Sequence, residues 1–162
     1  MTDLAALLTA LADAGAEFVI VGGVAATIHG SSRLTQDVDL VYSRADENIA
    51  RLVAALQPYR PYLRGVPPGL PFDWSAATLQ RGLNFTLTTS LGDVDLLGEI
   101  TGGGRYEDVL AHSVAVELFG RRHRCLDLEW LIRTKRAAGR PRDLEAIAEL
   151  ERLHDDPDLR GG

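Results

Sequence analysis

Residues Val19 to Val41 read VIVGGVAATIHGSSRLTQDVDLV. The segment opens with β-branched residues, passes through Gly22 and Gly23, and closes with a second apolar run that follows Asp37. β-branched apolar runs favour strands, and paired glycines permit a tight turn with close backbone approach. We therefore predict a strand over 17–21, a glycine turn, a short helix over 24–29 and a second strand over 38–42.

Periodic patterns place this segment in a larger α/β arrangement. Leucines spaced as on one helix face predict a helix over 3–14, and a second amphipathic run predicts a helix that ends near Pro58. Apolar runs separated by short turns predict antiparallel hairpins over 83–98 and 114–126, with helices over 127–136 and 141–153. The expected fold class is α/β, of the α+β kind: a mixed sheet flanked by helices, with a small helical C-terminal subdomain.

Two segments break these patterns. Residues 57–73 contain most of the prolines, namely Pro58, Pro61, Pro67, Pro68 and Pro71. Proline lacks a backbone donor, so we predict an irregular connection there, suited to act as a lid and not as a second domain. The glycine triplet over 102–104 predicts a flexible loop before a helix over 106–111.

Length and composition indicate one domain over 1–162, with a core over about 15–126 and C-terminal helices over about 127–154. The single cysteine, Cys125, rules out an internal disulfide. The formal net charge of -6 argues against a general nucleic-acid-coating surface, which needs a basic footprint. The sequence shows neither a signal-peptide pattern nor an apolar run of about 20 residues, so we expect a cytoplasmic protein without membrane association.

Two pairs of acids carry the strongest chemical signal. Asp37 and Asp39 are two residues apart at the start of a strand, so their side chains project from one face of the sheet. Neighbouring carboxylates repel each other unless a cation lies between them, and their oxygens are ligands that suit Mg²⁺. A later strand offers a third carboxylate from Asp93 or Asp95. Periodicity does not choose between them; we favour Asp95 because two leucines follow it, whereas Asp93 lies beside the turn.

Candidate phosphate-binding residues stand beside the first acid pair. Gly22 and Gly23 let backbone amides approach a phosphate, and the helix after them points its positive end toward the same place. Arg33 is a candidate bidentate phosphate ligand. Each feature alone is more often structural, since Asp-x-Asp is common at strand starts and Gly-Gly usually forms only a turn. Their combination at this spacing favours a phosphate and metal site.

The combined pattern resembles the polymerase-beta-like nucleotidyltransferase superfamily, whose signature is a strand, a Gly-Gly or Gly-Ser turn, a helix, an Asp-x-Asp strand and a later third acid. More narrowly, residues 21–40 are similar to the nucleotidyltransferase toxins of bacterial type IV (abortive-infection) toxin–antitoxin systems and their uncharacterised relatives, through Gly-Gly, His-Gly, Arg-x-Thr and Asp-x-Asp. The run KRAAGRPRDL over 135–144 is similar to their C-terminal motif of Lys, Arg-Pro and Asp. The likeness covers about residues 15–153.

The resemblance implies an enzyme that uses two Mg²⁺ ions to move a nucleoside monophosphate from an NTP to a hydroxyl of an RNA (tRNA) or protein acceptor, with release of pyrophosphate. It also implies a mixed sheet of the nucleotidyltransferase fold and, for a toxin, a cognate antitoxin as partner. The implied residues are Asp37, Asp39 and Asp95 for metal binding and catalysis, Gly22 and Gly23 for phosphate binding, Lys135 and Arg140 for neutralising the triphosphate, and Asp143 for orienting one of these cations.

Two observations qualify that assignment. Many superfamily members have a serine at the position of Gly23, so a hydroxyl contact with phosphate is lost here while backbone contacts remain. The C-terminal cluster also has a structural interpretation: Lys135 near one helix end and Asp143 in the first turn of the next helix both interact favourably with helix dipoles.

Two further functions fit the sequence. An antibiotic (aminoglycoside-type) nucleotidyltransferase has a similar Gly-Gly and Asp-x-Asp core, although this chain leaves little room for a separate acceptor domain. A non-catalytic NTP-binding or partner-binding module keeps the same fold, although the presence of all three acids argues against decay of the site. The base of the NTP, the acceptor and the oligomeric state stay open at this point.

Overall fold

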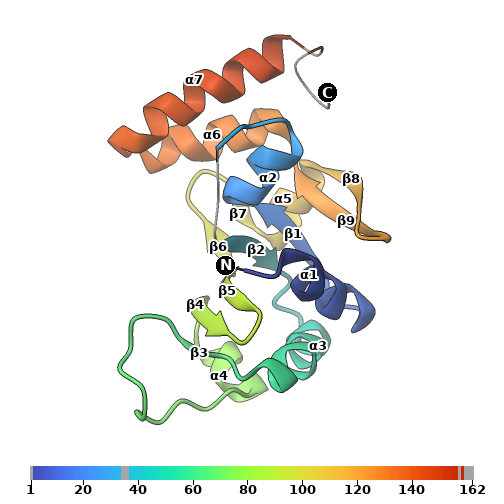
Figure 1. Ribbon diagram of the computed structural model, residues 1–162, viewed down its shortest axis with the longest axis vertical. Coiled ribbons are helices and arrows are strands. Elements are labelled where there is room, and N and C mark those ends of the chain that lie inside the picture. The colour runs from blue at the N-terminus through green and yellow to red at the C-terminus, as the bar shows by residue number, and fades with distance from the viewer. Residues whose placement is uncertain (1, 34–36, 157, 159–162) are drawn as a thin grey trace.

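A seven-stranded mixed sheet runs through the computed structural model of the protein, which describes residues 2–33, 37–156 and 158 (Figure 1). In spatial order the strands are β3 (Tyr62–Leu63), β4 (Asn84–Thr89), β5 (Gly92–Leu97), β2 (Val38–Tyr42), β1 (Phe18–Val21), β9 (Arg121–Leu126) and β8 (Ser113–Leu118). β2 is parallel to β5, β1 is parallel to β9, and the other neighbours are antiparallel. A separate small sheet pairs β6 (Glu99–Ile100) with β7 (Gly104–Arg105).

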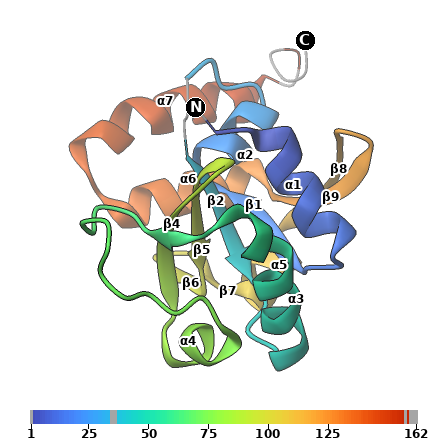
Figure 2. The same cartoon turned by 60° about the horizontal axis from the view of Figure 1, so that its bottom comes forward.

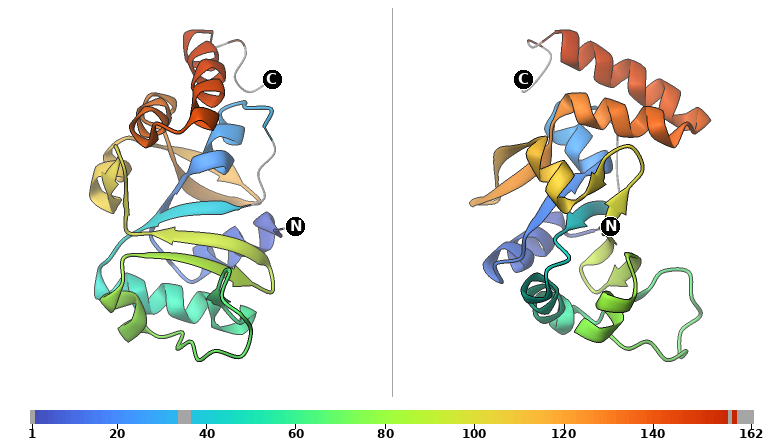
Figure 3. Two further views of the ribbon diagram at one scale, coloured as in Figure 1. Left: turned by 90° about the vertical axis from the view of Figure 1, so that its left-hand side faces the viewer. Right: turned by 180° about the vertical axis from the view of Figure 1, so that it is seen from behind.

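Helices cover both faces and one end of this sheet. They are α1 (Leu4–Asp13), α2 (Gly22–Ile28), α3 (Asp46–Leu56), α4 (Ala76–Arg81), α5 (Tyr106–Ala111), α6 (Leu128–Ala138) and α7 (Pro141–Asp155). α6 and α7 pack together at one end of the molecule, with α2 beneath them (Figures 1 and 3). α1 and α3 pack side by side (Figure 2), and α5 packs on β1, β2 and β9.

Local sequence signals set the helix ends. Asp3 caps α1, because its Oδ1 accepts a hydrogen bond from the Ala6 amide at 3.0 Å. Asp127 caps α6 in the same way, through the Trp130 amide at 2.7 Å. Pro141 occupies the first position of α7, where its missing donor costs nothing.

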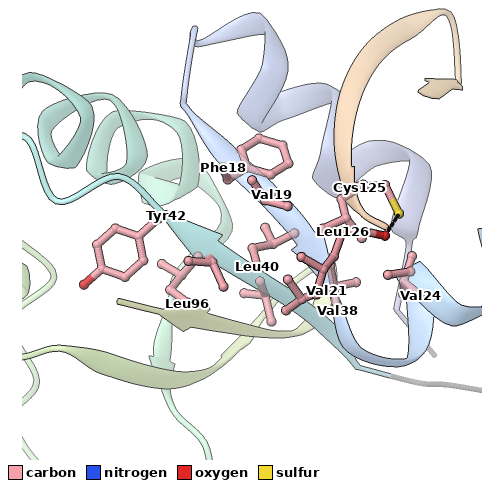
Figure 4. Close-up of a cluster of buried hydrophobic side chains, with 14 of the residues drawn as sticks. Phe18, Val19, Val21, Val24, Val38, Leu40, Tyr42, Leu96, Cys125 and Leu126 are labelled. Atoms are coloured by element: carbon pink, nitrogen blue, oxygen red, sulfur yellow. Dashed lines mark hydrogen bonds between the residues drawn. The ribbon is translucent and has the colours of Figure 1, made fainter. Parts of the chain in front are cut away.

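The core forms on one face of the central strands. Val38 and Leu40 of β2 lie beside Val94 and Leu96 of β5, and each of these side chains is at most 1% exposed (Figure 4). Since side chains alternate along a strand, the residues between them project from the opposite face. The buried apolar face therefore fixes the direction in which the acids of both strands point.

The structure confirms the expected α/β class and the helical C-terminal part, and it corrects several details. α2 begins at Gly22, so the two glycines form the first turn of the helix and do not precede it. The proline-rich segment contains a 3₁₀ helix, Gln57–Tyr59, and the strand β3, which pairs with β4 at the sheet edge. A two-residue strand directly after Pro61 is too short to show alternation in the sequence. α4 was likewise not expected.

The glycine triplet lies in a packed hairpin and not in a free loop. β6 and β7 pair across the turn that Gly102 and Gly103 form, and Gly104 is itself the first residue of β7. A Cβ added to Gly102 would overlap Ala137 of α6, so a side chain there would prevent this packing. Among the described residues, no helix is both long and apolar enough to cross a membrane.

Candidate active site

The acids predicted from sequence converge on one face of the sheet. Asp39 of β2 is directly opposite Asp95 of β5 in the parallel register, and Asp37 and Asp93 lie two residues earlier on the same sides. We call these four residues the acid row. Asp95 is the more enclosed of the later pair, with 21% of its side chain exposed against 37% for Asp93. The choice of Asp95 as the third acid of the site stays a prediction.

Gly22 allows the Asp39 side chain to take its position. A Cβ added to Gly22 would overlap Asp39 Oδ2, and the backbone at Gly22 has a φ of 67°, which side-chain-bearing residues rarely adopt. Val21 of β1 is opposite Asp39 in the antiparallel register, so the chain enters α2 directly beside the carboxylate. Space and conformation therefore both require glycine at this position.

Asp39 has the most strongly perturbed carboxyl group of the site. Burial raises the pKa of Asp39, and the neighbouring Asp95 and Asp37 carboxylates raise it further, to about 7. The positive charge of Lys135 acts in the opposite direction. A hydrogen bond between the Asp39 and Asp95 carboxyl groups also contributes to the raised pKa of Asp39.

A residue that the sequence did not single out, Arg64, lies among the acids. Its Nη2 is 2.8 Å from Asp95 Oδ1, its Nε is 3.4 Å from Asp93 Oδ2, and its Nη1 is 3.8 Å from Asp37 Oδ2. Arg64 directly follows β3, the strand that the proline-rich composition concealed. The sequence would have placed Arg64 beside the sheet only if the short strand Tyr62–Leu63 were recognisable in it.

A cleft of about 410 Å³ opens beside Asp39. Gly22, Lys135 and Arg140 line it together with Asp39, and residues of the β6–β7 hairpin and α6 complete its wall. One candidate phosphate-binding residue from α2 and two from the α6–α7 corner thus line the same cleft as one acid. Gly22 precedes Lys135 and Arg140 by more than a hundred positions in the sequence. The packing of α2 on α6 brings them together.

Asp143 holds the two cations of this cleft in place. Its Oδ2 accepts a hydrogen bond from Arg140 Nε at 2.8 Å, and its Oδ1 lies 3.4 Å from Lys135 Nζ. The Asp143 side chain is only 2% exposed. The hydrogen bond from Arg140 lowers the pKa of Asp143, and Lys135 adds to the effect, so Asp143 is ionised at neutral pH. Asp143 also accepts from the Arg140 amide at 3.2 Å, which caps α7.

Arg33 is placed differently from the sequence-based expectation. Its guanidinium pairs with Glu145 at 3.4 Å and Glu149 at 3.9 Å on α7, and it does not line the cleft beside Asp39. It does border a small cavity of about 60 Å³ together with Gly23 and Lys135. Arg33 therefore fastens the loop after α2 to α7. Thr35 of the sequence motif lies outside the described residues.

A second cleft adjoins the first and shares Ile100 and Thr101 with it. It measures about 560 Å³ and lies between the end of β4, the β6–β7 hairpin and α6. Trp130 on its wall is stacked on His112 with ring centroids 3.7 Å apart, and Arg133 lies over the same indole. The two clefts are therefore neighbours, and only the first is lined by Asp39.

The donor set fits a divalent cation in its chemistry. The acid row supplies only hard carboxylate oxygens, and the mutual repulsion of Asp39 and Asp95 is what a cation would relieve. In the structure the carboxylates of Asp37, Asp93 and Asp95 surround the Arg64 guanidinium. The described residues contain no group of three or more His, Cys, Asp or Glu side chains arranged to hold a metal ion. A metal at this site would therefore need the acids to move relative to Arg64.

Comparisons with known proteins add no family assignment. No protein-family model matches the sequence, and no curated protein shows significant similarity to it.

Proposed function

We propose that the protein is an Mg²⁺-dependent nucleotidyltransferase that moves a nucleoside monophosphate from an NTP to an acceptor hydroxyl. The observation that supports this most is the register of Asp39 and Asp95 on adjacent parallel strands, with Asp37 on the same face and Lys135 and Arg140 across the adjoining cleft. An acid cluster that faces a basic pair is suited to a metal-bound triphosphate, because each part of the ligand meets its opposite charge.

Each side chain has a definite role in this proposal. Asp37, Asp39 and Asp95 hold the divalent cations, which when bound neutralise phosphate charge and lower the pKa of the attacking hydroxyl. Lys135 and Arg140 neutralise the oxygens of the triphosphate that become pyrophosphate, and Asp143 keeps both cations directed at the cleft. The amides at Gly22 and Gly23 are positioned to donate to a phosphate oxygen.

The oxygen of the acceptor hydroxyl attacks the α-phosphorus. The bond between the α-phosphorus and the oxygen that bridges it to the β-phosphorus breaks, so that pyrophosphate leaves. The proton of the hydroxyl passes to a carboxylate of the acid row or to water. The second cleft, next to the first, offers space for the acceptor. The motif resemblance favours a tRNA or a protein as acceptor. It also favours a role as a toxin with a cognate antitoxin.

A second candidate function is a non-catalytic module that binds a nucleotide or a partner. The observation that favours it is Arg64, which already neutralises part of the acid row without a metal ion. The aminoglycoside-type alternative shares the donor site with the first proposal and differs only in the acceptor.

The two candidates separate in a labelling experiment. The protein is incubated with each α-³²P-labelled NTP, Mg²⁺ and cell extract or purified tRNA, and label in the acceptor is measured. Asp39→Asn and Asp95→Asn should each lower the initial rate of labelling by at least about a hundredfold. Asp46→Asn, an exposed acid at the start of α3, is the matched control and should leave the rate unchanged. NTP binding without any transfer would support the non-catalytic module, and full labelling by the two variants would exclude the proposed site.

A further inference from the structure

Arg64 belongs to a row of residues that crosses four strands on the acid-bearing face. Asp39 is opposite Asp95 in the register of β2 and β5, and Asp95 is opposite Thr86 in the register of β5 and β4. The Arg64 amide donates to the Thr86 carbonyl oxygen at 3.0 Å, which continues the row beyond β3. The long Arg64 side chain reaches back across β4 to the acids.

The guanidinium compensates only part of the acid row. It contacts Asp95, Asp93 and Asp37 at 2.8, 3.4 and 3.8 Å, and Nη2 also donates to the Leu87 carbonyl oxygen at 2.8 Å. Asp39 is not among these contacts, and the cation that acts on it is Lys135. The guanidinium therefore contacts three of the four acids, and Asp39 is the member of the acid row that it does not reach.

The fit of Arg64 among the acids is incomplete. Its Nε is buried yet has no well-aligned hydrogen-bond acceptor within the part of the chain that the structure describes. Arg64 directly follows β3, a two-residue strand at the sheet edge. The exposed segment after Arg64 projects from the body of the molecule (Figures 1 and 3). About a quarter of the Arg64 side chain is exposed, so the guanidinium can move into water.

We infer that Arg64 is a built-in counterion that competes with divalent cations for the acid row, so that metal binding requires Arg64 to release Asp95. The inference rests on the proposed function in one respect, namely that the acids bind Mg²⁺. A guanidinium 2.8 Å from Asp95 Oδ1 and a divalent cation on the same carboxylate repel each other strongly at such short range. The contact keeps the metal-free site intact and sets the cation concentration at which it becomes occupied.

This role differs from that of a residue that only holds the acids in position. A positioning arginine improves the site for the metal, so its loss weakens metal binding. A competing counterion has the opposite effect, so its loss strengthens metal binding. The sign of the change therefore distinguishes the two roles.

The test measures Mn²⁺ binding to the purified protein by electron paramagnetic resonance of the free ion, without nucleotide or acceptor. Arg64→Gln should bind Mn²⁺ about tenfold more tightly than the wild type. Arg64→Lys, which keeps the charge, should stay much closer to the wild type. Arg122→Gln is the matched control, because Arg122 forms an exposed ion pair with Glu117 on the β8–β9 hairpin and should not change the affinity. Unchanged or weaker binding by Arg64→Gln would overturn the inference.

An Asp95→Asn variant separates this inference from the proposed function. If Asp95→Asn binds Mn²⁺ as the wild type does, the acid row is no metal site and both proposals fail. If Asp95→Asn loses binding while Arg64→Gln shows no gain, the metal site stands and only the counterion role is wrong. Thermal unfolding checks that Arg64→Gln is folded, and Mn²⁺ should raise its midpoint more than that of the wild type.

Discussion

The acid row and the basic pair, Lys135 and Arg140, are built on the same plan with opposite signs. In each region several like charges are held by a single residue of the other sign, which is Arg64 for the acids and Asp143 for the cations. The two central residues differ in their surroundings. Asp143 is 2% exposed and also caps a helix, whereas Arg64 is 26% exposed and follows a two-residue edge strand.

This difference indicates that one side of the site is preassembled and the other is exchangeable. Asp143 pairs with both Lys135 and Arg140. The hydrogen bond from Arg140, together with the charge of Lys135, lowers the pKa of Asp143. Arg64 leaves Asp39 uncompensated, and the pKa of Asp39 is raised to about 7. The basic pair thus has its counterion in place, while the acid row contains Asp39, whose pKa is raised first by burial and then by its acidic neighbours.

The largest effect should come from removing the residue that fixes the preassembled side. Asp143→Ala leaves two cations unpaired and removes the cap of α7, so the free energy of unfolding should fall by about 2–3 kcal/mol. Urea unfolding at pH 7 measures this loss. Asp13→Ala is the matched control, because Asp13 pairs with Arg121 at 2.7 Å on the exposed surface and should change stability little. An equal loss in both variants would show that burial does not distinguish the two ion pairs.

A smaller effect should reveal the uncompensated side through its pH dependence. Because the pKa of Asp39 is raised from 3.8 to about 7 on folding, its favourable contribution is fully present below the ordinary pKa and is lost as pH rises through 7. Asp39→Asn mimics the protonated form. Its stability relative to the wild type should therefore increase from pH 4 to pH 8 by about 1–3 kcal/mol, measured by urea unfolding with a chelator present.

The comparison for this measurement is Asp143→Asn, at the buried acid that pairs with Lys135 and Arg140. Asp143 should show the opposite sign, because its lowered pKa makes its contribution present above the ordinary pKa and lost on acidification. A pH-independent difference for Asp39→Asn would mean that neither burial nor the neighbouring acids raise the pKa of Asp39.

The sequence was sufficient for the parts of the site that depend on strand alternation. Alternation predicts that Asp37 and Asp39 share a face, and that Asp93 and Asp95 share a face. The register of β2 and β5 in the structure puts both pairs on the same side, opposite buried apolar residues. Asp127 and Pro141 predict where α6 and α7 begin, and the structure confirms both positions. Local rules act over a few residues, so they are readable in a single chain.

Residues brought together by long-range packing were not readable in this way. Arg64 comes from an edge strand with no periodic pattern, and it reaches the acids only because β3 pairs with β4. Arg33 was placed near phosphate by its position in the motif, but the structure pairs it with α7, more than a hundred residues later in the chain. In both cases the deciding partner lies on an element that sequence spacing does not identify.

The smallest expected effect tests whether the two sides of the site are electrostatically coupled. Lys135 lowers the pKa of Asp39 through its charge, so Lys135→Met should move that pKa further above 7. Titration of ¹³C-labelled carboxyl groups by NMR would follow Asp39 directly. Arg136→Met is the matched control, because Arg136 pairs with Glu151 of α7 and should leave the titration of Asp39 unchanged. Since a bound triphosphate would lie between Lys135 and the acid row, equal titration of Asp39 in all three proteins would mean that the two sides are too far apart to act on one ligand.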